Sequence, residues 1–373
     1  MASWDVIVVG VGGVGSSAAM HLAKAGVRVL GIDQYPPAHD RGSSHGKTRV
    51  IRQAYFEHPS YVPLLRRAYE LWEELETESR NKLFFRTGLV EMGPSDGVVI
   101  PGILRSAKEH ELSIEHLHAN EVIRRWPAMG GEEDWQAVIE KDAGFLKVEA
   151  CVEAHLQLAT KAGATLLHGD AVKSWESVGD GVEVTTERGK HHAARLLIAG
   201  GPWSHLLVDR LSSPLQILLK QQYWYQPAGP GLAVSDGFPC FFHETPYGFF
   251  YGFPALGDSG VKVARHSGGP VISGPSDEGT EDAEDRQLVE NYLRDYMPGV
   301  SQTLLSQAKC YYTTTPDEHF VMDQLADHPR VTVIAGLSGH GFKFTSVLGE
   351  IARDLVMGKT SPLNIDLFRI GRF

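Results

Sequence analysis

The chain contains few cysteines and has no long apolar run. Its 373 residues include three cysteines, Cys151, Cys240 and Cys310, which are far apart and odd in number. This pattern argues against a disulfide framework and suits a reducing compartment, so we expect a cytoplasmic protein. No apolar stretch approaches the ~20 residues of a membrane helix, and no leading charged-then-apolar stretch indicates a signal segment. We therefore expect no membrane association.

An excess of basic residues is also lacking. The chain has 35 Lys and Arg against 46 Asp and Glu, which gives a net charge of −11. That balance argues against general nucleic-acid binding, although a cleft can differ in sign from the whole surface. Metal-ligand spacings such as Cys-x-x-Cys or His-Glu-x-x-His are absent, so no metal is expected. The length and the 42% hydrophobic content suit a globular chain of one large or two interleaved domains.

The first 33 residues predict a strand, a helix and a second strand. "DVIVVG" is a short β-branched run, the next residues to Gly26 have helical spacing, and "VRVLGID" is a second strand that ends at Asp33. Such a βαβ unit implies a parallel sheet. The sequence therefore predicts an α/β fold that begins with a Rossmann-like unit.

A glycine-rich turn joins the first strand to this helix. Gly10, Gly12 and Gly15 form G-x-G-x-x-G, which allows a tight turn, close approach of a pyrophosphate and close packing of helix on strand. The free N–H groups at the start of the helix attract phosphates. Asp33 is placed to accept hydrogen bonds from a ribose and argues against NADP. The motif predicts dinucleotide binding without separating FAD from NAD; a tight turn with no ligand is the alternative.

The remaining chain alternates between this α/β pattern and a β-rich pattern. Helical spacing recurs at 61–75, 101–127, 147–163 and 286–297, and "VTVIAGLSGHGFKFTSVLGEIARDLVMG" is strand, glycine-rich turn and helix. Residues 267–285 are polar and predict a loop that ends at a helix start. We expect two domains built from separated segments. The FAD-binding type of domain takes residues 1–85, 145–214 and 320–373, and a substrate domain takes residues 86–144 and 215–319.

Several motifs occur together in a distinctive order. "GSSHGKTRVIRQAY", "YGFP", "VKVARH", "CYYTTTPDEHFVMD" and "GLSGHGFKF" follow the N-terminal glycine motif. With it they closely resemble the family of monomeric sarcosine oxidase, N-methyltryptophan oxidase and pipecolate oxidase, which are FAD-dependent amine oxidoreductases. The resemblance runs from Asp5 to the C-terminus. It implies a FAD-binding domain of the glutathione-reductase type and a substrate domain built on a mixed, mostly antiparallel β-sheet.

The resemblance also implies an activity. A monomeric oxidase of the family takes a hydride from the α-carbon of a secondary amino acid to flavin N5, which gives an imine that hydrolyses, while O2 is reduced to hydrogen peroxide. Sarcosine or another N-methyl amino acid is the expected substrate, and a cyclic imino acid such as pipecolate or proline is the alternative. An NAD-dependent dehydrogenase or a non-catalytic dinucleotide-binding protein would leave Cys310 and Lys262 unexplained.

Resemblance assigns cofactor contacts to two motifs. It implies that Cys310 is bonded through sulfur to the 8α-methyl carbon of the flavin, whereas a random cysteine in such a strand would be a buried apolar side chain. Ser44 and His45 would approach the cofactor, and Gly339 and Gly341 would let the backbone approach the flavin pyrimidine end. Ser44 and Lys47 differ from the Gly-Ser-His-His-Gly-Asp-Thr-Arg loop of sarcosine oxidase, which leaves the exact substrate open.

Two arginines and a lysine are candidates for the substrate carboxylate. Arg49 and Arg52, in "TRVIR", share one face if that stretch is helical, and an exposed pair of charges is the alternative. The resemblance implies that Arg52 binds the carboxylate, for which a guanidinium gives a planar two-point fit. Arg49 would lie close to the flavin ring. Lys343 would share the carboxylate with Arg52 and also contact the cofactor.

The β-rich region supplies the remaining candidates. Lys262 alternates with apolar neighbours on a strand, and His266 lies on the same face if the strand stays regular. The resemblance places Lys262 over the flavin, where its charge would favour oxygen reduction. His266, Tyr251 and Tyr312 would line the substrate side. A solvated strand face is the alternative for Lys262.

Overall fold

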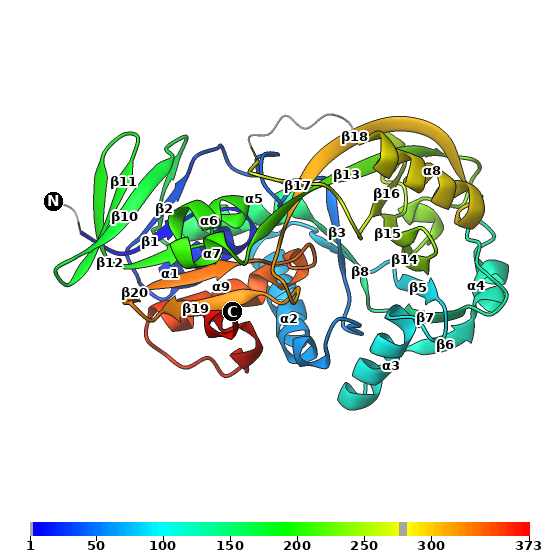
Figure 1. Ribbon diagram of the computed structural model, residues 1–373, viewed down its shortest axis with the longest axis horizontal. Helices are drawn as coiled ribbons and strands as arrows, with labels where there is room; N and C mark the ends of the chain where they lie inside the picture. The colour runs from blue at the N-terminus through cyan, green and yellow to red at the C-terminus, as the bar shows by residue number, and fades with distance from the viewer. Residues whose placement is uncertain (1–2, 276–281) are drawn as a thin grey trace.

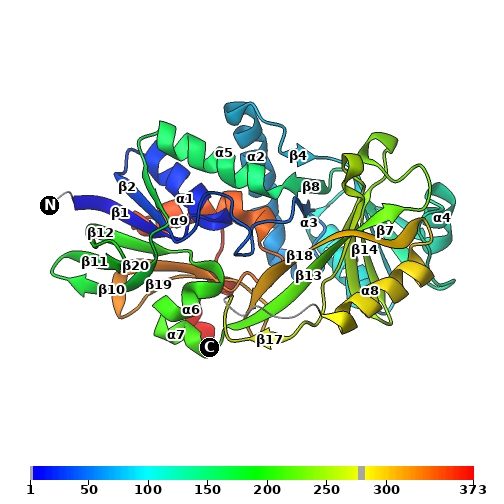
Figure 2. The ribbon, with the colours of Figure 1, turned by 90° about the horizontal axis from the view of Figure 1, so that it is seen from above.

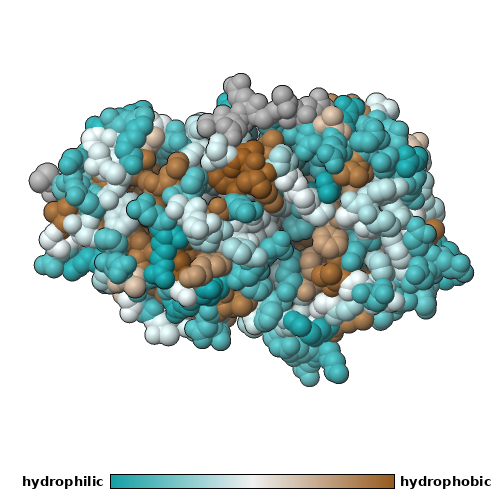
Figure 3. All heavy atoms as spheres, viewed as in Figure 1, coloured by the Kyte–Doolittle hydropathy of each residue, from teal (hydrophilic) through white to brown (hydrophobic). Residues whose placement is uncertain are grey.

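Two large β-sheets form the two ends of the molecule, and helices cover them (Figures 1 and 2). The computed structural model describes residues 3–275 and 282–373. Two long strands, described below, run between the two ends (Figure 2). The face seen in Figure 3 is largely hydrophilic, and hydrophobic side chains gather on it only in small areas.

The first sheet confirms the predicted βαβ unit. β1 pairs in parallel with β2 through Val6↔Val29 to Val9↔Ile32, and α1 connects them. β12 and β9 extend the parallel part, and β10, β11 and β19 add antiparallel neighbours. The strands of this sheet are β1 (Ser3–Val9), β2 (Val29–Asp33), β9 (Thr165–His168), β10 (Val172–Val178), β11 (Gly181–Thr186), β12 (Lys190–Ile198), β19 (Val321–Leu325) and β20 (His328–Ala335).

The second sheet is mixed and mostly antiparallel, as predicted. Within the described residues β5 and β14 pair in parallel, and the other neighbouring strands are antiparallel. β13 and β18 form a long ladder that reaches from this sheet toward the first one (Figure 2). Its strands are β5 (Leu89–Gly93), β6 (Glu115–His118), β7 (Gln136–Glu140), β13 (Gln216–Pro227), β14 (Cys240–Thr245), β15 (Gly248–Phe253), β16 (Val261–Arg265), β17 (Val271–Ile272) and β18 (Val300–Thr314).

A small third sheet lies between them and corrects one expectation. Its strands are β3 (Thr48–Ile51), β4 (Phe84–Phe85) and β8 (Gly144–Lys147). The stretch with Arg49 is thus a strand and not a helix, and Arg52 follows its end. Arg49 and Arg52 therefore do not share a helical face. The β-branched residues of "TRVI" pair with β8, and this tertiary pairing overrides the helical spacing.

The helices bury the apolar positions that their spacing predicted. Most residues of α1 are buried, and α2 buries Leu64, Leu65, Leu71 and Trp72 in the core that covers the first sheet. Cys151 is buried on α5, as expected for a residue on the apolar side of that helix. The helices are α1 (Gly13–Lys24), α2 (Val62–Ser79), α3 (Val99–His110), α4 (Ala119–Arg125), α5 (Val148–Lys161), α6 (Ser204–Leu207), α7 (Asp209–Ser212), α8 (Ala283–Tyr296) and α9 (Thr345–Val356).

Two details of the predicted organisation remain. The polar segment 267–285 contains the short strand β17 and ends in α8, and its residues 276–281 lie outside the described part of the chain. The division into domains stays a prediction: the strands of the first sheet fall in the ranges assigned to cofactor binding, and those of the second in the substrate ranges. No helix within residues 3–275 and 282–373 is both long and apolar enough to cross a membrane.

Candidate active site

A cavity of about 430 Å³ begins at the glycine-rich turn and extends to β18. Its walls come from the carboxyl ends of β1 and β2, the start of α1, the loop before β3 and the turn before α9. Ligands of open α/β sheets bind at these strand ends. The predicted site residues that line this cavity are Gly10, Gly12, Asp33, Ser44, Arg49, Cys310, Tyr312, Gly339 and Gly341.

Two glycines of the motif are required by the packing around them. Gly10 has φ +82°, and a Cβ there would lie 2.6 Å from the carbonyl oxygen of Ala199. Gly15 does not line the cavity, and a Cβ on it would lie 1.8 Å from the carbonyl oxygen of Gly10. Gly15 therefore lets α1 pack directly on the turn, which holds the start of the helix toward the cavity.

Asp33 fixes the geometry of the turn. Its carboxylate accepts hydrogen bonds from the backbone N–H of Val11 at 2.8 Å and of Tyr35 at 3.0 Å. The carboxylate is almost fully buried at the end of β2 and lines the cavity. Each oxygen keeps a lone pair for a ligand hydroxyl, so a ribose contact stays compatible with these bonds.

Cys310 lies on β18 at the far end of the same cavity. The Arg49 guanidinium donates a hydrogen bond from Nη2 to its sulfur at 3.2 Å. Burial alone would raise the pKa of the thiol, but Arg49, His45 and Lys262 together lower it to about 6. A cysteine in such surroundings is largely thiolate at neutral pH. By contrast, burial raises the pKa of Cys151 and of Cys240.

A second cavity, of about 60 Å³, adjoins the first and shares Arg49, Tyr312, Gly339 and Phe342 with it. The structure brings most of the predicted catalytic side chains together around it. These come from the second large sheet, from β3 of the small third sheet with the segment after it, and from the turn before α9. The residues that line it are Arg49, Val50, Arg52, Glu57, Leu89, Phe242, Tyr251, His266, Tyr312, Gly339, His340, Phe342 and Lys343.

Arg52 is held on several sides. Its Nη2 donates to both oxygens of Glu57 at 3.0 and 2.9 Å, and its Nη1 donates to the carbonyl of Ala54 at 2.9 Å. The guanidinium also packs on the rings of Tyr55 and Phe56. Burial opposes the charge, but Glu57 and other neighbours raise the pKa of Arg52 above its ordinary value, so it stays cationic.

Lys343 supplies a second cation next to Arg52. It lies in the 3-10 helix η5 (Phe342–Phe344) and donates from Nζ to the carbonyl of His340 at 2.8 Å. Burial and the neighbouring Arg52 lower the pKa of Lys343 to about 7. The lysine lines only the smaller cavity, and its contact with a cofactor stays a prediction.

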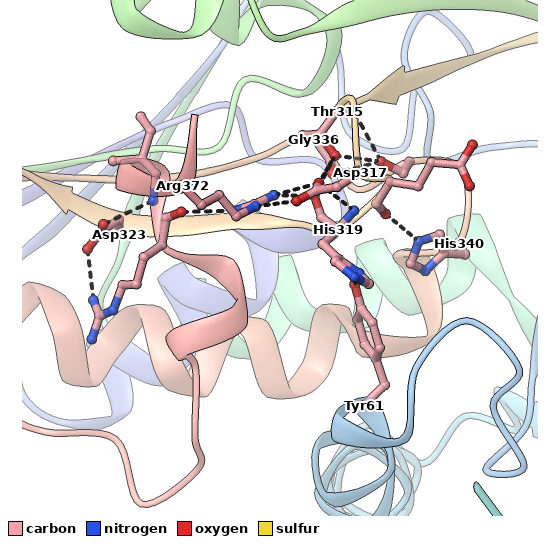
Figure 4. A network of polar contacts seen from close by, with 12 residues as sticks. Tyr61, Thr315, Asp317, His319, Asp323, Gly336, His340 and Arg372 are labelled. Carbon is pink, nitrogen blue, oxygen red and sulfur yellow. Dashed lines mark hydrogen bonds and ion pairs between the residues drawn. The ribbon is translucent and has the colours of Figure 1, made fainter. Parts of the chain in front are cut away.

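His340 is fixed as one neutral tautomer. Its Nε2 faces the carbonyl of Glu318 at 3.0 Å and must donate to it, so Nδ1 accepts from the hydroxyl of Tyr55 at 2.5 Å. Burial lowers the pKa of His340 to about 4. Asp317, the residue before Glu318, accepts hydrogen bonds from Arg372 (Figure 4).

The aromatic side of the smaller cavity holds His266 against Tyr312. His266 follows the end of β16 rather than continuing it, and its Nδ1 lies 3.3 Å from the hydroxyl of Tyr312. Burial and the nearby Lys220 lower the pKa of His266 to about 3. Lys220 donates to the carbonyls of His266 and of the next two residues, which holds this loop in place. His266 is therefore a neutral hydrogen-bonding group at neutral pH.

Lys262 and His45 lie behind the cavity walls rather than in them. Lys262 donates from Nζ to the carbonyls of Gly46 and Thr48, at 2.6 and 3.0 Å, and is fully buried. Burial and Arg49 lower the pKa of Lys262. The structure thus brings Lys262, Arg49 and His45 close to Cys310. The alternation of Lys262 with apolar residues on its strand did not indicate which groups it faces.

Comparison with known proteins supplies the family. A family model described as FAD dependent oxidoreductase matches residues 5–355. The chain belongs to the FAD-dependent oxidoreductases. A monomeric sarcosine oxidase of Streptomyces avermitilis is 42% identical over 371 residues, 98% of this chain and 97% of that protein. An N-methyl-L-tryptophan oxidase of Salmonella dublin is 39% identical over 373 residues, 99% of each chain.

Solved structures agree with this assignment. NikD, described as an unusual amino acid oxidase essential for nikkomycin biosynthesis, is 26% identical with a TM-score of 0.87, and the match covers 99% of this chain and 98% of that one. An L-proline dehydrogenase from P. horikoshii has a TM-score of 0.84 at 22% identity and covers 100% and 98% of the two chains, which shows a shared fold.

The larger cavity fits the FAD of this family of oxidoreductases. The hydroxyls of Thr313 and Thr345 line it and are buried without a hydrogen-bond partner among the described residues. Unpartnered buried hydroxyls of this kind are satisfied by a polar ligand. The start of α1, the glycine-rich turn and Asp33 suit the dinucleotide, and the opposite end of the cavity reaches Cys310.

Sequence reasoning missed several residues of this site. Glu57, His340 and Phe242 line the smaller cavity, Lys220 holds the His266 loop, and Glu91 lies behind Arg52. Glu57 and His340 stand near the motifs "TRVIRQAY" and "SGHGFKF", so their position in the sequence was a usable signal. Glu91 lies in the apolar strand "LVEMG". A single acidic residue among apolar residues in a strand indicates a buried carboxylate that needs a partner.

Proposed function

We propose that this protein is an oxidase of small secondary amino acids, with sarcosine or another N-methyl amino acid as substrate and O2 as the final acceptor. The observation that carries the proposal is the pair of buried cations, Arg52 and Lys343, in a small aromatic cavity that adjoins the FAD cavity. Cations in a dry site bind a carboxylate strongly, and Arg gives it a two-point fit. The sequence relatives named for sarcosine and N-methyl-L-tryptophan oxidation support the reaction class.

The side chains divide the work. FAD bound in the larger cavity would supply the oxidant for the substrate C–H bond, and its reduced form would be reoxidised by O2. Arg52 and Lys343 hold the carboxylate, and their charges favour the unprotonated substrate amine because they disfavour a further positive charge. The site needs no strong base, and His266 with Tyr312 provides neutral hydrogen-bonding groups beside the amine.

Lys262 is proposed to favour the reaction with oxygen. A positive charge fixed by two carbonyls stabilises the negative charge that develops as O2 accepts an electron. Arg49 separates the two cavities and holds Cys310, so it is proposed to contact the cofactor. Ser44, His45, Gly339 and Gly341 complete the proposed cofactor contacts.

The size of the smaller cavity bears on the substrate. At about 60 Å³ it suits sarcosine, a short N-methyl amino acid or a cyclic imino acid such as proline or pipecolate better than an indole side chain. We therefore propose a small aliphatic substrate. We also propose that the protein is monomeric, on the basis of the sequence resemblance, and that it is cytoplasmic, on the basis of its three free cysteines.

A substrate panel tests the function. Oxygen consumption and peroxide formation by the purified yellow protein are measured with sarcosine, N-methyl-L-alanine, L-proline, L-pipecolate and N-methyl-L-tryptophan. We expect the highest kcat/KM with sarcosine or N-methyl-L-alanine. Turnover of N-methyl-L-tryptophan alone would contradict the small substrate, and a colourless protein that uses NAD would contradict the oxidase.

We also propose that Cys310 holds FAD through its sulfur. The low pKa of this thiol and its place in the cavity wall support the link, because the thiolate is the nucleophilic form. After acid precipitation the wild type and a Cys240→Ala control should keep yellow pellets, whereas Cys310→Ala should release its FAD. Flavin that stays attached in Cys310→Ala would show that another residue carries the link.

A further inference from the structure

Glu91 is a buried carboxylate that the proposed reaction does not use. It lies in the middle of β5, between β14 and β7, and its side chain is 0% exposed. Neither carboxylate oxygen has a hydrogen-bond partner among the described residues. Leu89, two residues earlier on the strand, lines the smaller cavity, so Glu91 lies on the face of the sheet that carries the cavity wall.

Arg52 is the charged group that faces Glu91. Glu91 Oε1 lies 3.5 Å from Arg52 Nε, whereas Glu57 accepts from Nη2 and the carbonyl of Ala54 accepts from Nη1. Glu57 lines the smaller cavity and Glu91 does not. A substrate carboxylate from the cavity can therefore reach Arg52 at Nη2, where Glu57 lies, while Glu91 faces Nε from outside the cavity.

Such a carboxylate has two possible effects on Arg52. In its protonated form it is neutral and leaves the full charge of Arg52 to the ligand. In its ionised form it pairs with Arg52, and it adds a negative charge that repels a second carboxylate on the other side. Because Glu91 is shielded from water, this difference is not screened by salt in the way a surface charge would be.

We propose that Glu91 is a positioning residue that sets, through the gain or loss of its own proton, how strongly Arg52 binds the substrate carboxylate. The inference rests on the proposed function, because it takes Arg52 as the carboxylate site. It adds a pH-sensitive element that lies outside the cavity and does not touch the substrate.

Burial favours the protonated form of Glu91 at neutral pH. Burial raises its pKa to about 8, Glu140 and Glu57 add to the rise, and Arg52 and Lys343 oppose it. Glu140 lies on β7, Glu57 and Arg52 in the segment after β3, and Lys343 in η5. The negative charge therefore appears only as the pH rises through about 8, and carboxylate binding should weaken over that range.

Equilibrium binding of a non-oxidisable carboxylate tests the inference. Methoxyacetate has the shape of sarcosine with an ether oxygen in place of the amine, so the ligand itself does not titrate between pH 6 and 9.5. Its Kd is measured by calorimetry with the FAD-loaded wild type and with Glu91→Gln. At pH 6.5 the two values should agree within about twofold. At pH 9.5 the wild type should bind about tenfold more weakly than Glu91→Gln.

Comparing wild type with Glu91→Gln separates the titration of Glu91 from that of other groups, because the other groups titrate in both proteins. Lys343 loses its proton near pH 7 in both, so it lowers affinity in both. If Glu91→Gln does not fold, Glu91→Leu replaces it, because it also lacks the charge. The matched control is Glu133→Gln, at an exposed position, whose Kd should have the same pH profile as the wild type. Superimposed pH profiles for wild type and Glu91→Gln would overturn the inference, and so would a lack of methoxyacetate binding by both.

Failure of the proposed function gives a different result. If no secondary amino acid is oxidised but methoxyacetate still binds with the Glu91-dependent profile, the oxidase assignment is wrong and the role of Glu91 stands. If sarcosine is oxidised and the profiles coincide, the oxidase assignment stands and the role of Glu91 is wrong.

Discussion

Arg52 carries more contacts than any simple carboxylate clamp needs. Glu57 takes two hydrogen bonds from the guanidinium, Ala54 takes one, and two aromatic rings pack on it. A substrate carboxylate must therefore replace Glu57 at that edge of Arg52. Glu57 stays ionised, because Arg52, His340 and Lys343 outweigh its burial and lower its pKa. The free protein thus holds the arginine that is proposed to bind the substrate already paired and desolvated.

The first prediction removes that arginine. Arg52→Ala should lower kcat/KM for the best amino-acid substrate by a factor that corresponds to ~2–4 kcal/mol, the scale for one partner of a charged hydrogen bond in a dry site. Steady-state oxygen consumption measures it. Arg124→Ala, at an exposed position on α4, is the control and should behave as the wild type. An unchanged kcat/KM in Arg52→Ala would remove Arg52 from substrate binding.

A second prediction concerns Lys262, whose charge is proposed to serve the oxygen reaction. Lys262→Met keeps the length of the stem, and reoxidation of reduced FAD by O2 should slow by ~100-fold or more. Anaerobic reduction by substrate should change far less. Because burial lowers the pKa of Lys262, the wild-type oxygen reaction should slow as the pH rises, while the variant should lose this dependence.

Stopped-flow measurement of the two half-reactions separates the roles of Lys262. Lys161→Met, at an exposed lysine on α5 that lines neither cavity, is the matched control. Normal reoxidation together with slow reduction would assign Lys262 to substrate handling instead.

At the scale of elements, α1 and the turn before it form one rigid unit. The turn needs Gly10 in its left-handed conformation, and the helix packs on the turn only because Gly15 has no side chain. The βαβ unit therefore delivers the helix start to the cofactor cavity through contacts between backbone atoms. Such contacts leave no room for adjustment by rotamer changes.

The third prediction tests this packing. Gly15→Ala places a methyl group where the carbonyl oxygen of Gly10 lies, so α1 must shift. We expect a loss of roughly 1–3 kcal/mol in stability, the usual range for overpacking, and a lower FAD content after purification. Gly229→Ala is the control, because a Cβ there meets nothing within 4 Å. Equal thermal unfolding and flavin content in Gly15→Ala and the control would contradict the role of Gly15.

Elements with a strong local pattern could be predicted from the sequence. The βαβ unit, α2 and α5 follow from apolar spacing and glycine positions, and the structure has them in place. "TRVIR" could not be read locally, because its pairing with β8 depends on residues about a hundred positions away. The same limit applies to the site: the motifs marked Arg52 and Lys343, but only the fold brings Glu91 to Arg52.

At the scale of the whole molecule, the last residues of the chain reach the neighbourhood of the smaller cavity. Arg372, in the 3-10 helix η7 (Ile370–Arg372), donates to both oxygens of Asp317 at 2.7 and 3.1 Å (Figure 4). The neighbouring Glu318 has φ +58°, and its carbonyl accepts from His340, which lines the cavity. The C-terminus therefore fastens the turn that fixes the tautomer of a cavity residue.

The fourth prediction is that this fastening is sensitive to acid. Hydrogen bonds from Arg372, the His319 N–H and Thr315 outweigh burial and lower the pKa of Asp317 to about 2. The stabilisation is therefore complete above the ordinary pKa of an aspartate, near 4, and is lost as the pH falls toward 2. Arg372→Ala should lower the free energy of unfolding at pH 7 by no more than about 1 kcal/mol, since the pair is partly exposed.

Urea unfolding of wild type and Arg372→Ala at pH 7, 5, 4 and 3 measures this effect. The difference between the two proteins should be constant from pH 7 to 5 and should shrink below pH 4. Below that pH Asp317 gains a proton in the unfolded chain, whereas in the folded wild type it stays ionised until the pH nears 2. Arg330→Ala, which breaks the far more exposed pair with Asp180, is the control and should change little at any pH. A difference for Arg372→Ala that is as large at pH 3 as at pH 7 would mean that Arg372 acts through packing and through its bonds to the carbonyls of His319 and Arg369.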